Sequence, residues 1–109
     1  MASPTDTPVL DLLGTMTEAS VAASSLDSRA LMLVRIAALV AVDAPPVSYV
    51  MNLGAASDLD IDADDVRGVL TAVAPIVGTA RTASATANIV SALALALDVA
   101  ALEEAGDAG

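Results

Sequence analysis

The sequence predicts an all-α domain that associates with copies of itself, and three observations support this. Apolar residues recur at helical spacing in several segments, with none of the alternation typical of strands. Hydrophobic residues make up 56% of the 109 residues but aromatic residues only 1%, so small side chains favour close packing of helices. Charged residues make up 17%, against about 25% in average soluble domains. This proportion of charged residues is too small to cover the surface of an isolated monomer. A second copy of the chain is the simplest way to cover the remaining apolar surface.

A flexible arm is expected over residues 1–8, followed by one helical domain over residues 9–104. The first helix follows Pro8 and is weakened by Gly14, because glycine disfavours the interior of a helix. The apolar residues that predict this helix are Val9, Leu10, Leu12, Leu13 and Met16.

The segment LDSRALMLVRIAALVAVD is the strongest helix signal in the chain. Asp27 or Ser28 can cap this second helix by accepting a hydrogen bond from a free backbone N–H. From Ala30 to Val42 every residue except Arg35 is apolar. A helix that is apolar on all sides is expected to be buried on all sides. In a chain of this size, such burial requires another subunit.

Two prolines separate the second helix from the third. Pro45 and Pro46 end the one or begin the other, because a proline at the first helical position loses no hydrogen bond. A short third helix is expected from about Pro46 to Ser57.

The aspartate-rich segment DLDIDADDV leads into the fourth helix. Asp62 is expected to be its N-cap, with Asp65 completing a capping box. The alternating aspartates do not predict a calcium loop, because the glycine and glutamate that an EF-hand needs are missing. Pro75 predicts a kink or break near residues 72–74, and Gly78 is expected to end the helix.

The last helix is expected over residues 79–97, or as far as Glu104, followed by an acidic flexible tail over residues 105–109. Asn88 is a polar residue on an apolar side of this helix, and it is expected to specify a helix interface.

The residue types that are missing exclude several functions. The chain has no Cys, His, Lys, Phe or Trp, so disulfides, thiol nucleophiles, thiolate metal sites and histidine bases are excluded. Its net charge of −10 argues against nucleic acid and anionic membranes as partners, because phosphate binding needs a cationic surface. No metal site and no cofactor are expected.

The expected location is the cytoplasm. The segment MASPTDTP has neither the basic region nor the apolar core of a secretion signal. No uncharged apolar run reaches the roughly 18 residues of a membrane span.

The segment DAPPVSYVMN holds most of the residues with useful chemistry. Ser48 and Asn52 are four residues apart, on one face of the expected helix, and with Tyr49 they can line a pocket. Ser48 has no histidine or lysine to activate it as a nucleophile, so helix capping or hydrogen bonding in the core is the simpler interpretation. Tyr49 is expected to pack in the core with its hydroxyl hydrogen-bonded, the alternative being a catalytic acid.

Arg35 is the one charge within an apolar helix and must be paired, because an unpaired buried charge costs several kcal/mol. Alternatively, Arg35 binds the carboxylate of a small ligand in a bidentate fork. The same two alternatives, an ion pair or a bound carboxylate, apply to Arg81 with less support. The acids expected to pair with Arg35 are Asp11, Asp43, Asp58 or an acid on another subunit. The candidate pocket therefore consists of Arg35, Ser48, Tyr49 and Asn52.

A capped helix, LDSRALMLVRIAALVAV, leads into APPVSYVMNLGAASDLDID, then into the acid-capped helix ADDVRGVLTAVAPIVG and a final helix of small residues. This order resembles the carboxymuconolactone decarboxylase family, which includes the alkylhydroperoxidase D-type proteins. The resemblance covers residues 26–97. It implies a small helical fold that assembles as trimers or hexamers.

The redox members of that family carry Cys-x-x-Cys with a histidine four residues later. The matching positions here are Pro45, Ser48 and Asn52. Proline and serine supply neither the thiolate nor the resolving thiol that such a peroxidase needs. Asparagine does not relay protons near neutral pH, as the decarboxylase members require of histidine. Thiol peroxidase activity is therefore not expected.

Three functions are consistent with these observations. The first is a carboxymuconolactone decarboxylase-like homotrimer or homohexamer without redox cysteines, with a structural role or a small carboxylate as ligand. The alternative is a decarboxylase, isomerase or lactone-processing enzyme for small cyclic carboxylic acids, acting through Arg35 and the turn residues. The third is a subunit or cargo of a larger protein assembly, docking through either terminus.

Overall fold

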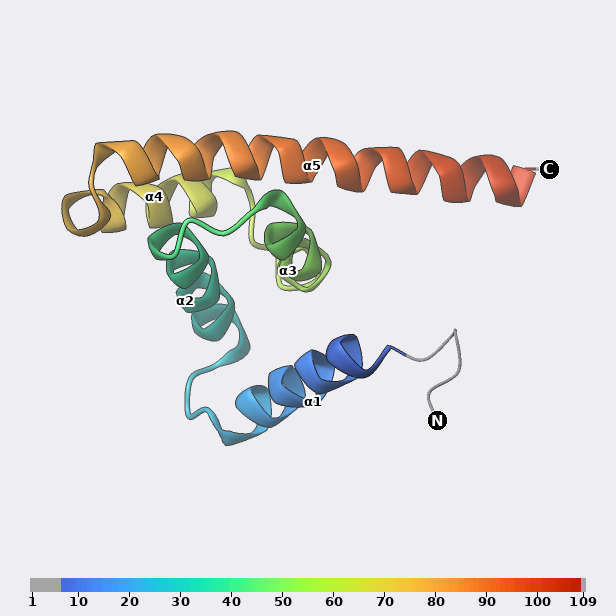
Figure 1. Ribbon diagram of the computed structural model, residues 1–109, viewed down its shortest axis with the longest axis horizontal. Coiled ribbons are helices and arrows are strands. Elements are labelled where there is room, and N and C mark those ends of the chain that lie inside the picture. The colour runs from blue at the N-terminus through green and yellow to red at the C-terminus, as the bar shows by residue number, and fades with distance from the viewer. Residues whose placement is uncertain (1–6, 109) are drawn as a thin grey trace.

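Five α-helices form the part of the chain that the computed structural model describes, residues 7–108 (Figure 1). Within this range, side chains are described except at residues 53–58 and 96–108. No strand occurs among the described residues, which confirms the all-α prediction. The helices are α1 (Pro8–Ala23), α2 (Ser28–Ala41), α3 (Pro46–Asp58), α4 (Ala63–Val77) and α5 (Thr79–Ala108).

The core forms where α2, α3 and α4 meet α5. Helix α5 packs against α3 and also contacts α4 and α2, while α2 packs against α4 and α3. The first half of α5 runs beside α4, and its C-terminal half extends past the other helices (Figure 1). The buried apolar residues are Leu31, Met32, Ile36, Val40, Ala44, Tyr49, Ala85, Ile89 and Ala92.

Helix α2 begins as predicted but is not buried on all sides. The side chain of Asp27 accepts a hydrogen bond from the backbone N–H of Ala30 at 2.8 Å, so Asp27 rather than Ser28 is the N-cap. Val34 and Val42 are exposed, because α3, α4 and α5 cover only one side of the helix. Within a single chain, the prediction of burial on all sides is therefore wrong.

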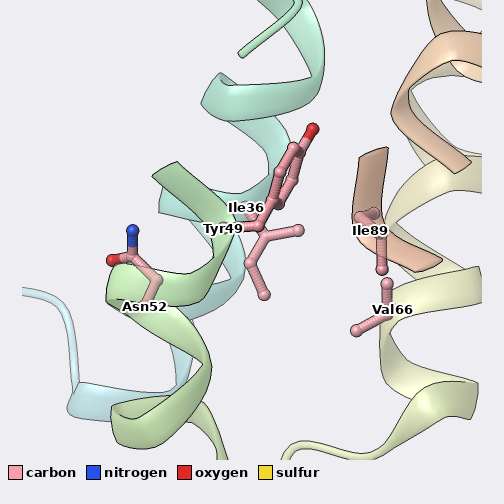
Figure 2. A pocket seen from close by; sticks show the side chains of 5 residues that line it. All are labelled: Ile36, Tyr49, Asn52, Val66 and Ile89. Carbon is pink, nitrogen blue, oxygen red and sulfur yellow. The ribbon is translucent and has the colours of Figure 1, made fainter. Parts of the chain in front are cut away.

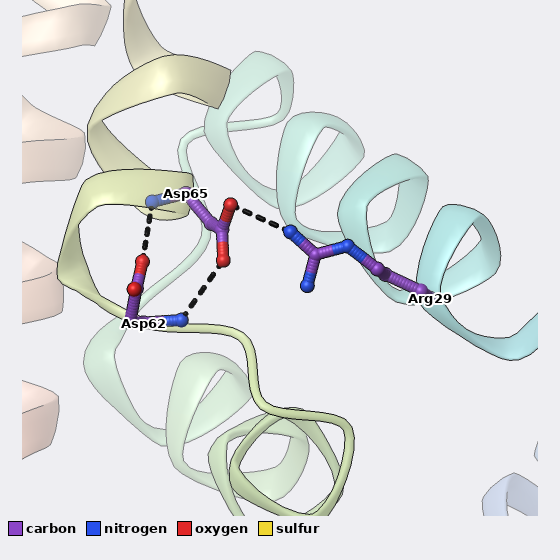
Figure 3. A network of polar contacts seen from close by, with 3 residues as sticks. All are labelled: Arg29, Asp62 and Asp65. Atoms are coloured by element: carbon purple, nitrogen blue, oxygen red, sulfur yellow. Dashed lines mark hydrogen bonds and ion pairs between the residues drawn. The ribbon is translucent and has the colours of Figure 1, made fainter.

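The N-terminus of α4 combines a capping box with an ion pair (Figure 3). The Asp62 carboxylate accepts from the N–H of Asp65 at 2.9 Å, and the Asp65 carboxylate accepts from the N–H of Asp62 at 3.1 Å, as predicted. Arg29, at the start of α2, donates to Oδ1 of Asp65 at 2.6 Å. The hydrogen bond from the Asp62 backbone and the Arg29 guanidinium lower the pKa of Asp65. The box thereby joins the N-termini of α2 and α4.

Helix α4 continues through Pro75 to its end, so the predicted break near residues 72–74 is wrong. Proline removes one helical hydrogen bond. Because Pro75 lies in the last turn of α4, only a few helical residues follow it, and the loss of this bond does not end the helix earlier. Gly78 ends the helix as predicted, with its N–H donating to the carbonyl O of Ala74 at 2.9 Å. Gly78 has φ +90°, which glycine tolerates, and α5 begins at the next residue, Thr79.

Helix α5 is longer than predicted. It runs to Ala108, beyond residue 97 and beyond Glu104, and so includes residues 105–108, where a separate acidic tail was expected. None of the helices in the described range combines the length and the apolar character needed to cross a membrane.

Helix α1 lies apart from the other four helices (Figure 1). It has no buried residue. The hydrogen bond that links it to α2 runs from Nη2 of Arg35 to the carbonyl O of Thr17, at 3.4 Å. The flexible arm predicted for residues 1–8 falls on residues 1–6, which lie outside the described residues, and on the start of α1.

The capping box makes the stability of the fold depend on pH. Because the pKa of Asp65 is lowered from 3.8 in the folded chain, its carboxylate stabilises the fold above pH 3.8. This stabilisation is lost as the pH falls through the folded-state pKa. We expect Asp65→Asn to lower the urea midpoint at neutral pH and to have progressively less effect below the unfolded-state pKa.

The matched control is Asp64→Asn, which removes a carboxylate from the same helical turn outside the box. We expect it to shift the urea midpoint less than Asp65→Asn at neutral pH. An effect of Asp65→Asn that stays constant into the acid range would contradict the role given to this carboxylate.

Candidate functional site

Three polar side chains on one face of α5 hold the turn between α2 and α3. Arg81, Ser84 and Asn88 follow one another at spacings of three and four residues, which places them in one row on a helix. Each donates a hydrogen bond to residues 41–44, where α2 ends. We call these three residues the α5 polar row.

Arg81 and Ser84 hold the first part of the turn. The Arg81 guanidinium donates to the carbonyl O of Ala41, one of the last carbonyls of α2, which have no partner within their helix. A cation at this end also interacts favourably with the helix dipole. The Ser84 hydroxyl donates to Oδ1 of Asp43 at 2.7 Å. Asp43 has φ +55°, a conformation that aspartate adopts more readily than most residues.

Asn88 holds the second part of the turn. Its Nδ2 donates to the carbonyl O of Ala44 at 3.1 Å. Ala44 is buried, and a carbonyl removed from water needs a donor. Asn88 therefore lies at a helix interface, where the sequence predicted it, while Arg81 binds a carbonyl rather than an acid.

The turn leads into the residues predicted as the pocket. Pro46 is the first residue of α3, in agreement with the proline pattern, and Pro45 is exposed before it. Nδ2 of Asn52 donates to the carbonyl O of Ser48 at 2.9 Å. The spacing of these two residues thus brings them together, but through the backbone of their own helix.

A small cavity lies between α3 and the helices that cover it (Figure 2). It is lined by Ile36, Tyr49, Asn52, Val66 and Ile89 and has a volume of about 10 Å³. Tyr49 and Ile36 project toward Val66 and Ile89, whereas the amide of Asn52 is turned away from them (Figure 2). This volume is at the lower limit for one water molecule. A carboxylic acid does not fit in it.

Tyr49 is a buried core residue with an unsatisfied hydroxyl. It is 2% exposed, and its Oη has no hydrogen-bond partner among the described residues. The expectation of a hydrogen-bonded hydroxyl is therefore wrong for the described part of the chain. Burial and, to a smaller extent, the carboxylate of Asp43 raise the pKa of Tyr49 above its ordinary value of 10.0. The phenol is therefore protonated at neutral pH.

Arg35 lies away from the cavity. It is half-buried, and its guanidinium donates to the carbonyl O of Thr17. Among the described residues it forms no ion pair with Asp11 or Asp43, and the side chain of Asp58 lies outside those residues. Of the four residues of the predicted pocket, Tyr49 and Asn52 line the cavity, whereas Ser48 and Arg35 do not.

A larger apolar groove, not predicted from the sequence, lies between α4 and α5. Its volume is about 500 Å³, within the range of small-molecule sites but open along two helices. Spacings of four residues on each helix are the signal that predicts such a groove, once the two helices are known to be neighbours. We call this surface the α4–α5 groove; its apolar lining includes Ile61, Val66, Leu70, Ile89, Val90 and Leu93.

Comparison with family models, with curated proteins and with solved structures finds no match for this chain. Function is therefore inferred from the chemistry of these surfaces.

Removing one member of the α5 polar row is expected to lower the free energy of unfolding measurably. Asn88→Ala leaves the buried carbonyl of Ala44 without this donor, so we expect a loss of about 1–3 kcal/mol in the free energy of unfolding, measured by urea denaturation. Asn52→Ala is the matched control, because the carbonyl that Asn52 binds lies within a helix. Equal losses in the two variants would argue against the role of the row.

Removing the hydroxyl of Tyr49 is expected to stabilise the fold. Tyr49→Phe removes a buried polar atom that lacks a partner and keeps the ring, so we expect the free energy of unfolding to rise by about 1 kcal/mol. Urea denaturation measures this change. A destabilised Tyr49→Phe variant would mean that the hydroxyl is paired in the folded protein.

Proposed function

We propose that this protein is a self-associating helical module, a homo-oligomer with a structural role. The observation that carries the proposal is α1, a helix of 16 residues with no buried residue. Isolated helices of this length are marginal in water, so α1 needs a cover. Its large apolar side chains are 41–68% exposed: Val9, Leu10, Leu12, Leu13, Met16 and Val21.

The exposed apolar surface of α1 is large enough to matter energetically. Fully burying one such side chain contributes roughly 1.5–3 kcal/mol, so these half-exposed side chains together represent roughly 5–9 kcal/mol. Association costs about 4–15 kcal/mol in lost translational and rotational freedom. An equally apolar partner surface adds a gain similar to that of α1. Together the two surfaces are sufficient to favour association.

A structural role is better supported than the binding of a small acid. The cavity beside Tyr49 has room for about one water, and Arg35 donates to a backbone carbonyl outside it. Both the ligand-binding function and the enzyme of the alternative hypothesis need Arg35 and the turn residues in one site. Their separation favours the structural role.

We also propose that the chain is a carboxymuconolactone decarboxylase-like protein without the redox residues, assembled as a trimer or hexamer. The support is the order of the helices and the capping box at Asp62, which agree with the pattern that carries the resemblance. Pro45, Ser48 and Asn52 occupy the turn in which the thiols and the histidine of such proteins are expected. The α5 polar row holds residues 41–44, which directly precede these positions.

Sedimentation equilibrium tests self-association. We expect species at multiples of 10.7 kDa and an association constant that rises with salt, because screening weakens the repulsion between chains of net charge −10. The comparison uses about 0.1 M and about 1 M salt, between which the Debye length falls from about 10 to about 3 Å. A chain that stays monomeric at both salt concentrations would refute the proposal.

A further inference from the structure

Helix α1 carries its apolar residues as a stripe with the acids on the other side. Val9, Leu12, Leu13 and Met16 follow the i, i+3, i+4, i+7 pattern that places them on one face of a helix. Asp11 and Glu18, seven residues apart, belong to the opposite face. The helix has no basic residue. The stripe can therefore be buried without taking a carboxylate out of water.

The α4–α5 groove is a second apolar surface that the described residues leave uncovered. Val90 is 61% exposed and Leu93 is exposed too, although both lie beside the buried Ile89. The charged residues in its lining are Asp62 and Arg67. The carboxylate of Asp62 accepts a backbone hydrogen bond in the capping box. The Arg67 guanidinium is exposed, and its ion-pair partner among the described residues is Asp64, 3.7 Å away.

We propose that α1 of one copy docks in the α4–α5 groove of a second copy, an inference that rests on the self-association proposed above. The two surfaces match in length, since the stripe of α1 spans residues 9–16 and α5 contributes residues 86–93 to the groove, or about 12 Å of helix each. They also match in character, because each is mainly apolar and neither is covered by the described residues of its own chain.

Charge selects this pairing over the pairing of α1 with α1. Two α1 helices packed together bring four carboxylates, from Asp11 and Glu18 of each copy, into one small assembly with no cation on either helix. The groove instead carries the exposed guanidinium of Arg67 at its edge, beside the carboxylates of Asp62 and Asp64. An acidic helix in the groove therefore meets a cation that another copy of α1 does not offer.

Position selects a second copy over the same chain. Helix α1 lies on the far side of α2 and α3 from α5 (Figure 1). A hydrogen bond of 3.4 Å from Arg35 to the carbonyl O of Thr17 links it to α2 on that side. Because the docking helix and the groove are different surfaces, the contact closes either by reciprocal exchange in a dimer or around a ring.

Two variants, each damaging one surface, test the pairing. Leu12→Glu places a charge in the stripe of α1 and leaves the groove intact, and Val90→Lys places a charge in the groove and leaves α1 intact. Leu26→Glu and Val42→Lys are matched controls, with 48% and 69% exposure outside both surfaces, against 59% for Leu12 and 61% for Val90. Circular dichroism checks that all four variants are folded.

Native mass spectrometry and sedimentation equilibrium give the readout. We expect each of Leu12→Glu and Val90→Lys alone to associate at least tenfold more weakly than the wild type, while the controls associate normally. An equimolar mixture is expected to form a 1:1 species, because the intact helix of the Val90→Lys chain enters the intact groove of the Leu12→Glu chain.

Other results overturn the inference and separate it from the proposed function. If only Leu12→Glu weakens assembly, α1 pairs with a surface other than the groove, such as another α1; if only Val90→Lys does, the groove pairs with a surface other than α1. If neither variant weakens assembly, or if the mixture forms no 1:1 species, α1 does not dock in the groove although the protein self-associates. A monomeric wild type would instead refute the proposed function itself.

Discussion

The hydrogen bonds from the α5 polar row to the end of α2 are the constraint on which the rest of the fold depends. Arg81, Ser84 and Asn88 hold a turn in which backbone carbonyls leave one helix and the next helix begins. Tyr49 reaches the core only because that turn places α3 against α5. Its neighbours in the buried cluster include Ala44 and Ala92, and the dispersion contacts of such small side chains require helices to approach closely. The polar row sets that approach.

The small side chains of the core also account for the apolar surface that remains outside it. Alanines bury little area each, so the stability that larger residues supply in other domains is limited here. Large apolar residues are present in the chain, but many lie on α1 and in the α4–α5 groove. The chain thus divides its apolar residues between an internal core and external surfaces. A net charge of −10 opposes contact between copies, so shape and apolar character must select where contact occurs.

Features that depend on residues within one helical turn could be predicted from the sequence. The caps at Asp27 and Asp62 and the end of α4 at Gly78 are of this kind. The predicted break at Pro75 was wrong because its cost depends on how much helix follows, which is a question of length rather than residue type. The row on α5 joins residues 40–44 positions apart, and the partner of Arg35 is a backbone carbonyl on another helix. No local pattern predicts which helix end meets which helix face.

The joint between α4 and α5 restricts how the shape of the groove can vary. A single residue, Gly78, separates the two helices, and its φ of +90° is one that residues with a Cβ rarely adopt. A Cβ added there would meet no atom within 4 Å, so the constraint is torsional rather than spatial. Two dihedral angles therefore set the direction in which α5 leaves α4, and with it the width of the groove. Substitutions in the lining can therefore change the chemistry of the groove, while that one glycine preserves its shape.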